Sequence, residues 1–395
     1  NSGITNATGH ANLTSGGLYD FSTHTFTNCG ATGHIGPELT DCTSAYSSYG
    51  DYVNKPHFFN VIGESGTNGI QVWTVPDTGD YKIDAYGAKG GGTYGDPVNS
   101  EGGDGAYIQV RVSLTMGDKY MILCGQKGGA GANHLLGSSG GGGTFFVKGD
   151  DYTSVTLSDV MVVAGGGGGR GSTGHGTNSG QDGLAGSSDN TDGGAGGAYG
   201  CGGGGGLLDN GDGNGRDGSG PSGGYSFSNG GRGGTPGNYT NVAGQYGGFG
   251  GGGGASVHAG SGAGGIYGGN GTNPYNDNPN GRGGGSHYKG TLLYSSGGFN
   301  DDHGKLIITA VNTGGEVARQ IYSSNIKVTY FTNATFTTGD PVPYSSISID
   351  NHFKGRIFAP PPLYTFTSHT FTNCGKQGRY GPSYTQCINS YGTSG

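Results

Sequence analysis

The sequence predicts an all-β protein in which an antiparallel sandwich carries a long glycine-rich insertion. Residues 165–300 hold 55 of the 96 glycines, and glycine supplies no side chain that a conventional core could bury. Words with strand-like alternation stand on both sides of this tract, whereas no stretch shows the apolar spacing of an amphipathic helix. The flanking strands must therefore form the core, and the glycine tract is a long excursion from it.

Alternation with a period of two is clearest in the word YIQVRVSL. Ile108, Val110, Val112 and Leu114 fall on one face, and Tyr107, Gln109, Arg111 and Ser113 on the other, as in a half-buried strand. Further strands are expected, in chain order, at 81–87, 119–125, 143–149, 159–165 and 305–311, each bounded by Gly or Asp turns. Trp73, the only tryptophan, stands in the strand word IQVWTVP. We expect it to pack in the core rather than to form a binding platform.

Runs of five glycines at 165–169, 202–206 and 250–254 predict an unusual kind of packing. Without Cβ atoms, left-handed threefold helices that rise about 3.1 Å per residue can lie close enough to hydrogen-bond to one another. A flexible linker is the alternative for glycine-rich sequence. The interspersed words FG, AYGC and GGIYGGN favour an ordered bundle of polyglycine II helices, since aromatic groups and a cysteine indicate defined packing. A single collagen triple helix is excluded because a strict Gly-X-Y period is not kept.

The composition limits the classes of partner that the chain is expected to bind. The net charge is −8 with 12% charged residues, so there is no basic stripe and no nucleic-acid partner is expected. No run of about 18 apolar residues exists, so no membrane span is expected either. The chain opens on Asn1 without an apolar leader, and we interpret it as a processed or excised piece whose leader or anchor lies elsewhere.

Six cysteines form a pattern. Cys29 and Cys42 are thirteen residues apart, Cys374 and Cys387 are also thirteen apart, and Cys124 and Cys201 remain. The even count and the repeated spacing predict three disulfides and an oxidising compartment. Metal binding is the alternative, but no C-x-x-C occurs and the histidines are scattered.

Five N-x-S/T sequons point to the same compartment. They begin at Asn6, Asn12, Asn238, Asn270 and Asn333. Each sequon alone is a weak signal, but together with the cysteines they favour a secreted glycoprotein with covalent N-linked glycans.

Several words resemble the glycine-rich extracellular domain of the anaplastic lymphoma kinase and leukocyte tyrosine kinase family. They are FTNCGATGHIGPELTDCTSAY (26–46), GIQVWTVPDTGDYKIDAYGAKGGG (69–92), GGGGTFFVK (140–148), VMVVAGGGGGR (160–170), GGFGGGGGA (247–255), GGIYGGN (264–270) and HGKLIITAV (303–311). The resemblance implies a tumour-necrosis-factor-like jelly roll with an inserted bundle of polyglycine helices. Neither a kinase nor a growth-factor-like module accompanies these words, so we transfer the fold and not the ligand or the kinase activity.

The sequence contains only weak matches to motifs of nucleotide-binding, catalytic or calcium-binding sites. G-x-G-x-x-G recurs by chance in so glycine-rich a chain, and GSSGG at 137–141 lacks the strand-to-helix context of a nucleophile elbow. Asp209, Asp212 and Asp217 surround the word NGDGNG like the start of a calcium loop, but the distal Glu is missing, and a solvated turn is favoured. We therefore expect neither an enzyme nor a cofactor.

The ends of the chain carry a duplication. After an N-terminal segment (1–25) and the glycine-rich domain (26–311, insertion about 165–300), residues 312–363 are expected to form an extended linking arm with short strands. Residues 364–395 then repeat residues 19–50, with 16 identities in 32 positions. Either the chain is part of a tandem array, or the second copy docks on a neighbouring molecule. A decayed duplication without a role in assembly is the third possibility.

Both of the first two explanations give head-to-tail growth. A contact of this kind that does not close produces a filament of many copies of the same chain. The functional hypothesis is therefore a structural subunit of a secreted extracellular filament. The alternative is a cell-surface adhesin or a receptor-type module that binds a protein or a glycan.

Overall fold

The structure, a computed structural model, describes most of the first of two compact units, residues 1–312 and 313–395. The described residues are 18–50, 53, 55, 58–63, 69–92, 101–131, 136–172, 179–197, 201–213, 220–239, 242–243, 245–256, 258–273 and 279–311. The predicted arm (312–363) and the second copy (364–395) lie outside them. The same holds for the predicted sites Asn6, Asn12, Asn333, Asp217, Cys374 and Cys387.

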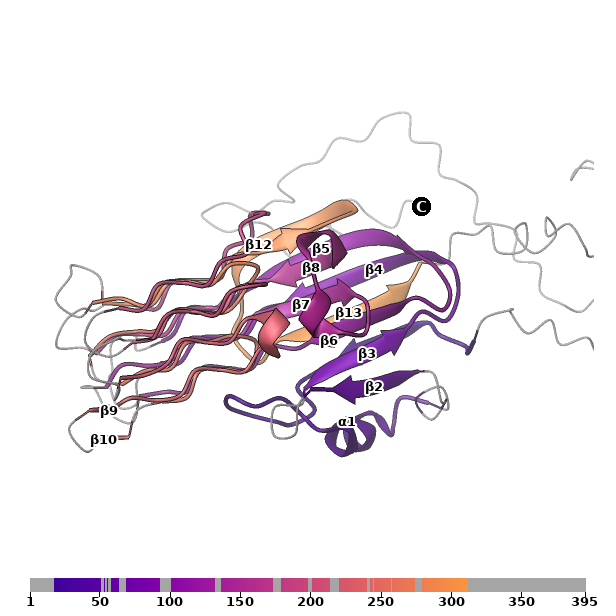
Figure 1. Cartoon of the computed structure of the whole chain (residues 1–395). Coiled ribbons are helices and arrows are strands. Elements are labelled where there is room, and N and C mark those ends of the chain that lie inside the picture. Colours follow the sequence, from indigo (N-terminus) through magenta and orange to yellow (C-terminus); the bar gives the residue numbers. More distant parts are fainter. Residues whose placement is uncertain are drawn as a thin grey trace, which may run out of the picture. The chain divides into compact units, whose positions relative to one another are not determined.

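Two antiparallel sheets form a jelly-roll sandwich (Figure 1). The five-stranded sheet has the order β1 (Thr23–Phe26), β13 (Lys305–Ala310), β4 (Gly79–Tyr86), β5 (Gly105–Leu114) and β12 (Thr291–Asn300). The six-stranded sheet has the order β11 (His287–Tyr288), β8 (Val160–Ala164), β7 (Thr144–Lys148), β6 (Lys119–Leu123), β3 (Ile70–Thr74) and β2 (Phe59–Ile62). The predicted all-β sandwich is confirmed.

Short elements complete the described chain. They are the helix α1 (Leu39–Tyr46), the single-turn helices η2 (Tyr152–Ser154), η3 (Leu157–Asp159) and η4 (Phe227–Asn229), and the strand pair β9 (Asn238–Tyr239) and β10 (Val242–Ala243). The helix α1 corrects the expectation that the chain contains no amphipathic helix. Two buried side chains four residues apart, Cys42 and Tyr46, are too few to give a visible periodicity.

The core between the sheets follows the predicted alternation. In β5, Ile108, Val110, Val112 and Leu114 are buried, whereas Arg111 and Ser113 are exposed. Trp73 in β3 is fully buried and packs with Tyr81, Tyr120 and Phe146, as expected. Burial of such large side chains supplies most of the stabilisation of a sandwich.

The glycine-rich segments continue the strands beyond one end of the sandwich, where they run side by side as wavy extended chains (Figure 1). Their hydrogen bonds repeat every three residues. Gly166 and Gly169 donate to Gly264 and Ser261 on one neighbouring segment, and Gly167 and Arg170 donate to Ala88 and Gly91 on another. A repeat of three residues is what the predicted threefold helices require.

Two boundaries of the insertion differ from the expected 165–300. Residues 88–91 and 138–142 also bond within the bundle, although they connect strands that precede residue 165. At the other end, β11 and β12 occupy residues 287–300 as strands of the two sheets. Bundle and sandwich are therefore interleaved along the chain, because segments that follow strands β4, β6 and β8 run on into neighbouring bundle positions.

A second core joins the glycine-rich segments to the sandwich. The outward-facing residues Ile70, Val72 and Phe145 of the six-stranded sheet pack with Phe227, Phe249, Leu207 and Ile266 of the glycine tract. The prediction of defined packing around the words FG and GGIYGGN is thereby confirmed. A few large side chains anchor the bundle, whereas glycines occupy many of its other positions.

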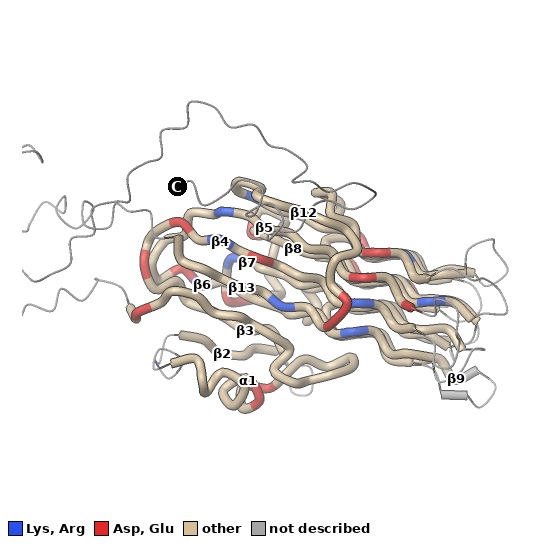
Figure 2. The backbone as a smooth tube through the Cα atoms, turned by 180° about the vertical axis from the view of Figure 1, so that it is seen from behind, with Lys and Arg blue, Asp and Glu red and all other residues tan. Residues whose placement is uncertain are grey.

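Charged residues of both signs are scattered along the coloured trace of Figure 2, and no continuous basic band runs over the described residues. Both Lys or Arg positions and Asp or Glu positions occur at the base of the glycine-rich segments (Figure 2). Among the described residues, no helix has the length and apolar character needed to cross a bilayer.

Candidate docking site of the repeated element

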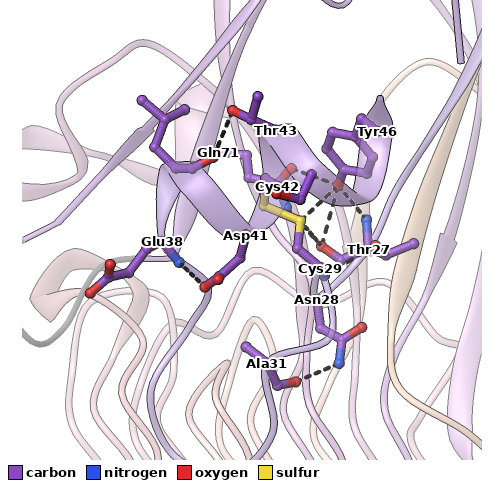
Figure 3. The surroundings of a disulfide bond; sticks show 12 residues. Thr27, Asn28, Cys29, Ala31, Glu38, Asp41, Cys42, Thr43, Tyr46 and Gln71 are labelled. Atoms are coloured by element: carbon purple, nitrogen blue, oxygen red, sulfur yellow. Dashed lines mark hydrogen bonds between the residues drawn. A yellow bond between two sulfur atoms is a disulfide. The ribbon is translucent and has the colours of Figure 1, made fainter. Parts of the chain in front are cut away.

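Residues 19–50, called here the first copy, form an edge strand followed by a disulfide-closed loop and a helix. Strand β1 pairs with β13 in the register Thr23↔Thr309 to Phe26↔Leu306. After a loop, α1 packs back, and a disulfide joins Cys29 to Cys42 (Figure 3). The first copy is thus a compact element at the edge of the five-stranded sheet.

A polar network fixes α1 against β1 and β3 (Figure 3). The hydroxyl of Tyr46 donates to the side-chain oxygen of Gln71 (2.8 Å) and accepts from the backbone N–H of Thr27 (2.9 Å). The Gln71 amide in turn donates to the backbone oxygen of Thr27 at 2.8 Å. Gln71 is fully buried, so these bonds satisfy polar groups that would otherwise destabilise the fold.

Aromatic rings fill the space beneath the first copy. Phe26 lies 6.1 Å from Phe58 between ring centroids, Tyr19 lies 5.6 Å from Phe58, and Phe21 lies 5.5 Å from Trp73. We call the surface covered in this way the docking surface, defined by β13, Phe58, Gln71, Trp73 and Tyr81.

The start of α1 has its own stabilisation. Glu38 is the residue before the helix, its backbone N–H donates to the Asp41 carboxylate at 2.9 Å, and its side chain accepts from the backbone of Asp41. This reciprocal arrangement is a capping box, which satisfies backbone donors at a helix N-terminus.

The loop between Cys29 and α1 reaches the glycine-rich segments. The backbone oxygens of Gly33 and His34 accept from Phe249 (2.7 Å) and Gly233 (2.9 Å), and the His34 ring stacks on Tyr246 at 4.0 Å. Burial and the nearby Arg232 charge lower the pKa of His34. The first copy therefore contacts both the sandwich and the bundle.

His24 lies at the centre of the aromatic cluster. Its ring is fully buried and lies 4.5–5.0 Å from the rings of Phe26, Tyr46, Tyr49 and Phe58. Burial lowers the pKa of His24 to about 3, because the apolar surroundings disfavour the imidazolium. The neutral ring is part of the packing of this element.

The second copy, residues 364–395, keeps every residue that the first copy buries. The eight buried positions of the first copy are Tyr19, His24, Phe26, Cys29, Gly36, Pro37, Cys42 and Tyr46. Their counterparts are Tyr364, His369, Phe371, Cys374, Gly381, Pro382, Cys387 and Tyr391, all identical. By contrast, 13 of the 16 exposed positions of the first copy differ in the second. Identity between the two copies thus follows burial, a relation that the sequence alone did not show.

The predicted third disulfide is wrong. Cys124 and Cys201 are free and buried: Cys124 packs in the core between the sheets, whereas Cys201 lies in the glycine-rich region, paired with Gly197 and Ala255. Burial raises the pKa of both thiols, that of Cys201 to about 12. Each thiol is a small buried side chain in its own packing environment, which an even cysteine count could not reveal.

The predicted glycan and calcium residues lie in the glycine-rich segments or outside the described chain. Asn270 is exposed, and its side-chain oxygen accepts from the backbone of Ala195 at 2.9 Å; Asn238 begins β9. Asp209 and Asp212 are both exposed, and the described residues hold no group of three or more potential metal ligands.

Comparisons with known proteins give a partial similarity. No protein-family model matches the chain. Over 104 residues, 26% of this chain, it is 38% identical to the leukocyte tyrosine kinase receptor of Mus musculus. The match spans 11% of that receptor, so the similarity concerns a small part of its length. Neither comparison assigns an enzymatic family to this chain.

Proposed function

We propose that this protein is a structural subunit of a secreted extracellular filament, joined head to tail through its arm (312–363) and second copy. One observation carries the proposal: the second copy repeats all eight residues that the first copy buries by packing within itself and against the rest of the described unit. The described sandwich has its docking surface filled by the first copy. Because another chain also carries its own first copy, the second copy can occupy the docking surface of that chain only by displacing the first copy.

The physical drive for such a junction is apolar burial. Phe26, Cys42 and Tyr46 are at most 1% exposed in the first copy, and complete burial of a large apolar side chain contributes about 1.5–3 kcal/mol. The matching residues of the second copy would gain similar energy against another sandwich. Left uncovered, they would form the kind of contiguous apolar patch that marks an interaction surface.

The extracellular setting rests on covalent chemistry. The Cys29–Cys42 disulfide requires an oxidising compartment to persist, and the five sequons supply acceptors for N-linked glycans. The partial similarity to the leukocyte tyrosine kinase receptor also favours an extracellular setting.

Negative-stain microscopy of the purified chain at rising concentration tests the proposal. We expect linear assemblies whose length grows with concentration, and their loss in the variant Phe371→Asp. Asp buries poorly in an apolar site, so the variant removes the driving force without touching the described sandwich. Uniform dispersed monomers at every concentration and salt condition would contradict the proposal.

A binding module for a protein or glycan is the second candidate, favoured by the similarity to a receptor. Phe371→Asp separates the two functions. Under the filament proposal the variant loses assembly, whereas a binding module keeps its ligand affinity because the sandwich and its loops are unchanged.

A further inference from the structure

We propose that the second copy docks on the docking surface of another copy of this chain, as an edge strand beside that copy's β13. This inference rests on the proposed filament function and names the partner surface of its junction. The occupant is residues 364–395, and the receiving groups are β13, Phe58, Gln71, Trp73 and Tyr81.

The register of the junction follows from the first copy. Thr23, Thr25 and Phe26 lie opposite Thr309, Ile307 and Leu306, and the hydroxyls of Thr23 and Thr309 are 3.1 Å apart. In the second copy Ser368, Thr370 and Phe371 take these places. Ser368 keeps a hydroxyl at the position that matches Thr23, so the proposed antiparallel pairing would retain the cross-strand hydrogen bond to Thr309.

The sequence of the second copy carries a helix-capping signal at the positions that match the start of α1. Glu38 and Asp41, which form the capping box of α1, become Ser383 and Gln386. Ser-x-x-Gln is the preferred form of the same reciprocal cap. The two copies differ at both positions, yet each sequence carries a capping pair there, as expected of an element that folds in the same way.

The polar network can also be rebuilt on the receiving chain. Tyr46 bonds to Gln71 and Thr27, and the second copy supplies Tyr391 and Thr372 at the same positions. Gln71 belongs to the docking surface and not to either copy. The buried amide of Gln71 needs two hydrogen-bond partners, a tyrosine hydroxyl and a backbone carbonyl at the position of Thr27. An occupant that lacks either group would leave the amide unsatisfied, so the site is selective for a complete copy.

The outer face of the two copies differs in charge. The first copy carries Asp20, Glu38 and Asp41 and no Lys or Arg, giving −3, whereas the second carries Lys376 and Arg379 and no Asp or Glu, giving +2. Arg379 takes the place of His34, which stacks on Tyr246 close to Arg232. An arginine can keep the stacking as a cation–π contact, but Arg232 repels it. The second copy is therefore the weaker occupant and the first copy its competitor.

Cysteine pairs in the full chain test the inference. Ser368→Cys combined with Thr309→Cys places two thiols opposite each other only if the second copy occupies the docking surface. The pair Thr23→Cys with Thr309→Cys is the matched control and should close within one chain. Mixed isotope-labelled and unlabelled chains, oxidised and mapped by mass spectrometry, distinguish links between chains from links within one chain.

Variants that weaken one copy at a time test whether the first and the second copy compete for the same docking surface. The tethered first copy has the advantage of high effective concentration, so Phe26→Asp should raise the between-chain link at least about tenfold. Phe371→Asp should abolish it. Should Phe26→Asp unfold the chain, as the control pair would reveal, the milder Tyr46→Phe and its match Tyr391→Phe replace it.

Each result is decisive. A disulfide that joins position 368 of one chain to position 309 of a differently labelled chain supports the inference. A link only within single chains, or no link while the control pair closes, overturns it. Filaments that persist in the microscope without the link would support the filament function and contradict this junction alone.

Discussion

In the sandwich, Trp73, Phe146 and Ile83 are fully buried and the two sheets meet through side chains, whereas in the glycine-rich bundle the backbones meet directly. A Cβ added at Gly167 would lie 1.8 Å from the carbonyl oxygen of Gly103, so no side chain fits at this position. The sandwich is held by apolar burial and the bundle by backbone hydrogen bonds. One region is sensitive to losing side-chain atoms and the other to gaining them.

The largest expected effect is the removal of a large side chain from the sandwich. Trp73→Ala should lower the free energy of unfolding by about 3–5 kcal/mol, because it leaves a cavity beneath the first copy. Denaturant unfolding monitored by circular dichroism measures the change. Leu293→Ala is the control, since Leu293 is 43% exposed. Equal losses in the two variants would contradict the side-chain account of this region.

Adding a side chain at a close backbone contact should destabilise the glycine-rich bundle. In Gly204→Ala the new Cβ would lie 1.8 Å from the carbonyl oxygen of Ala263, and we expect a loss of about 3 kcal/mol, near the upper range for overpacking. Gly186→Ala is the matched control, because nothing lies within 4 Å of its added Cβ. Hydrogen exchange of the bundle amides would locate the damage. A Gly204→Ala protein with unchanged exchange would show that the bundle tolerates side chains.

Acid should weaken the sandwich through His24. Its pKa is about 3 in the folded protein against 6.5 for a histidine that is not buried, so the unfolded state binds more protons between these values. Stability is therefore lost as the pH falls below about 6.5 and continues to fall to about pH 3, with about 2 kcal/mol lost at pH 5. Thermal unfolding from pH 7 to pH 4 measures this slope.

The variant His24→Phe should have a shallower pH slope than the unmodified protein. His34→Gln is its control, because His34 lies partly exposed at the bundle and its removal should change the slope less. An unchanged slope in His24→Phe would place the acid sensitivity elsewhere.

Surface ion pairs should matter least in either region. Lys119 and Asp150 lie 2.7 Å apart with both side chains about half exposed, so Lys119→Ala should cost less than about 1 kcal/mol. Unfolding at low and at high salt measures it. A loss comparable with that of Trp73→Ala would mean that charge, and not burial or backbone bonding, holds the sandwich.

The strands β3 to β8 and β13 could be predicted because strand-like alternation and apolar runs record which side chains face the core, whereas β1, β2, β11 and β12 were not predicted. β5 shows this clearly, with Ile108 buried and Arg111 exposed as expected. β12 was assigned to the insertion because most of this edge strand is exposed, including Leu292, Leu293 and Tyr294. An edge strand with little burial leaves no alternation to detect.

Only part of the candidate docking site could be predicted from the sequence. The duplicated Cys-x12-Cys frame marked residues 29–42 and 374–387 as a unit, and the Cys29–Cys42 disulfide is present. The contribution of Gln71 and Phe58 to the docking surface could not be predicted, because they lie on strands or loops distant in sequence. The pairing of Cys124 with Cys201 was wrong, since an even count says nothing about which thiols meet.

Sequence by itself determined the class of fold, the glycine-rich character of the bundle and the existence of two copies of one element, because alternation, composition and repetition are properties of a linear chain. Tertiary structure alone decided which glycines have neighbours too close for a Cβ, that both remaining thiols are free, and that the residues shared by the two copies are those the first copy buries. Burial is a property of which segments meet in space, and that is fixed only when the whole chain has packed.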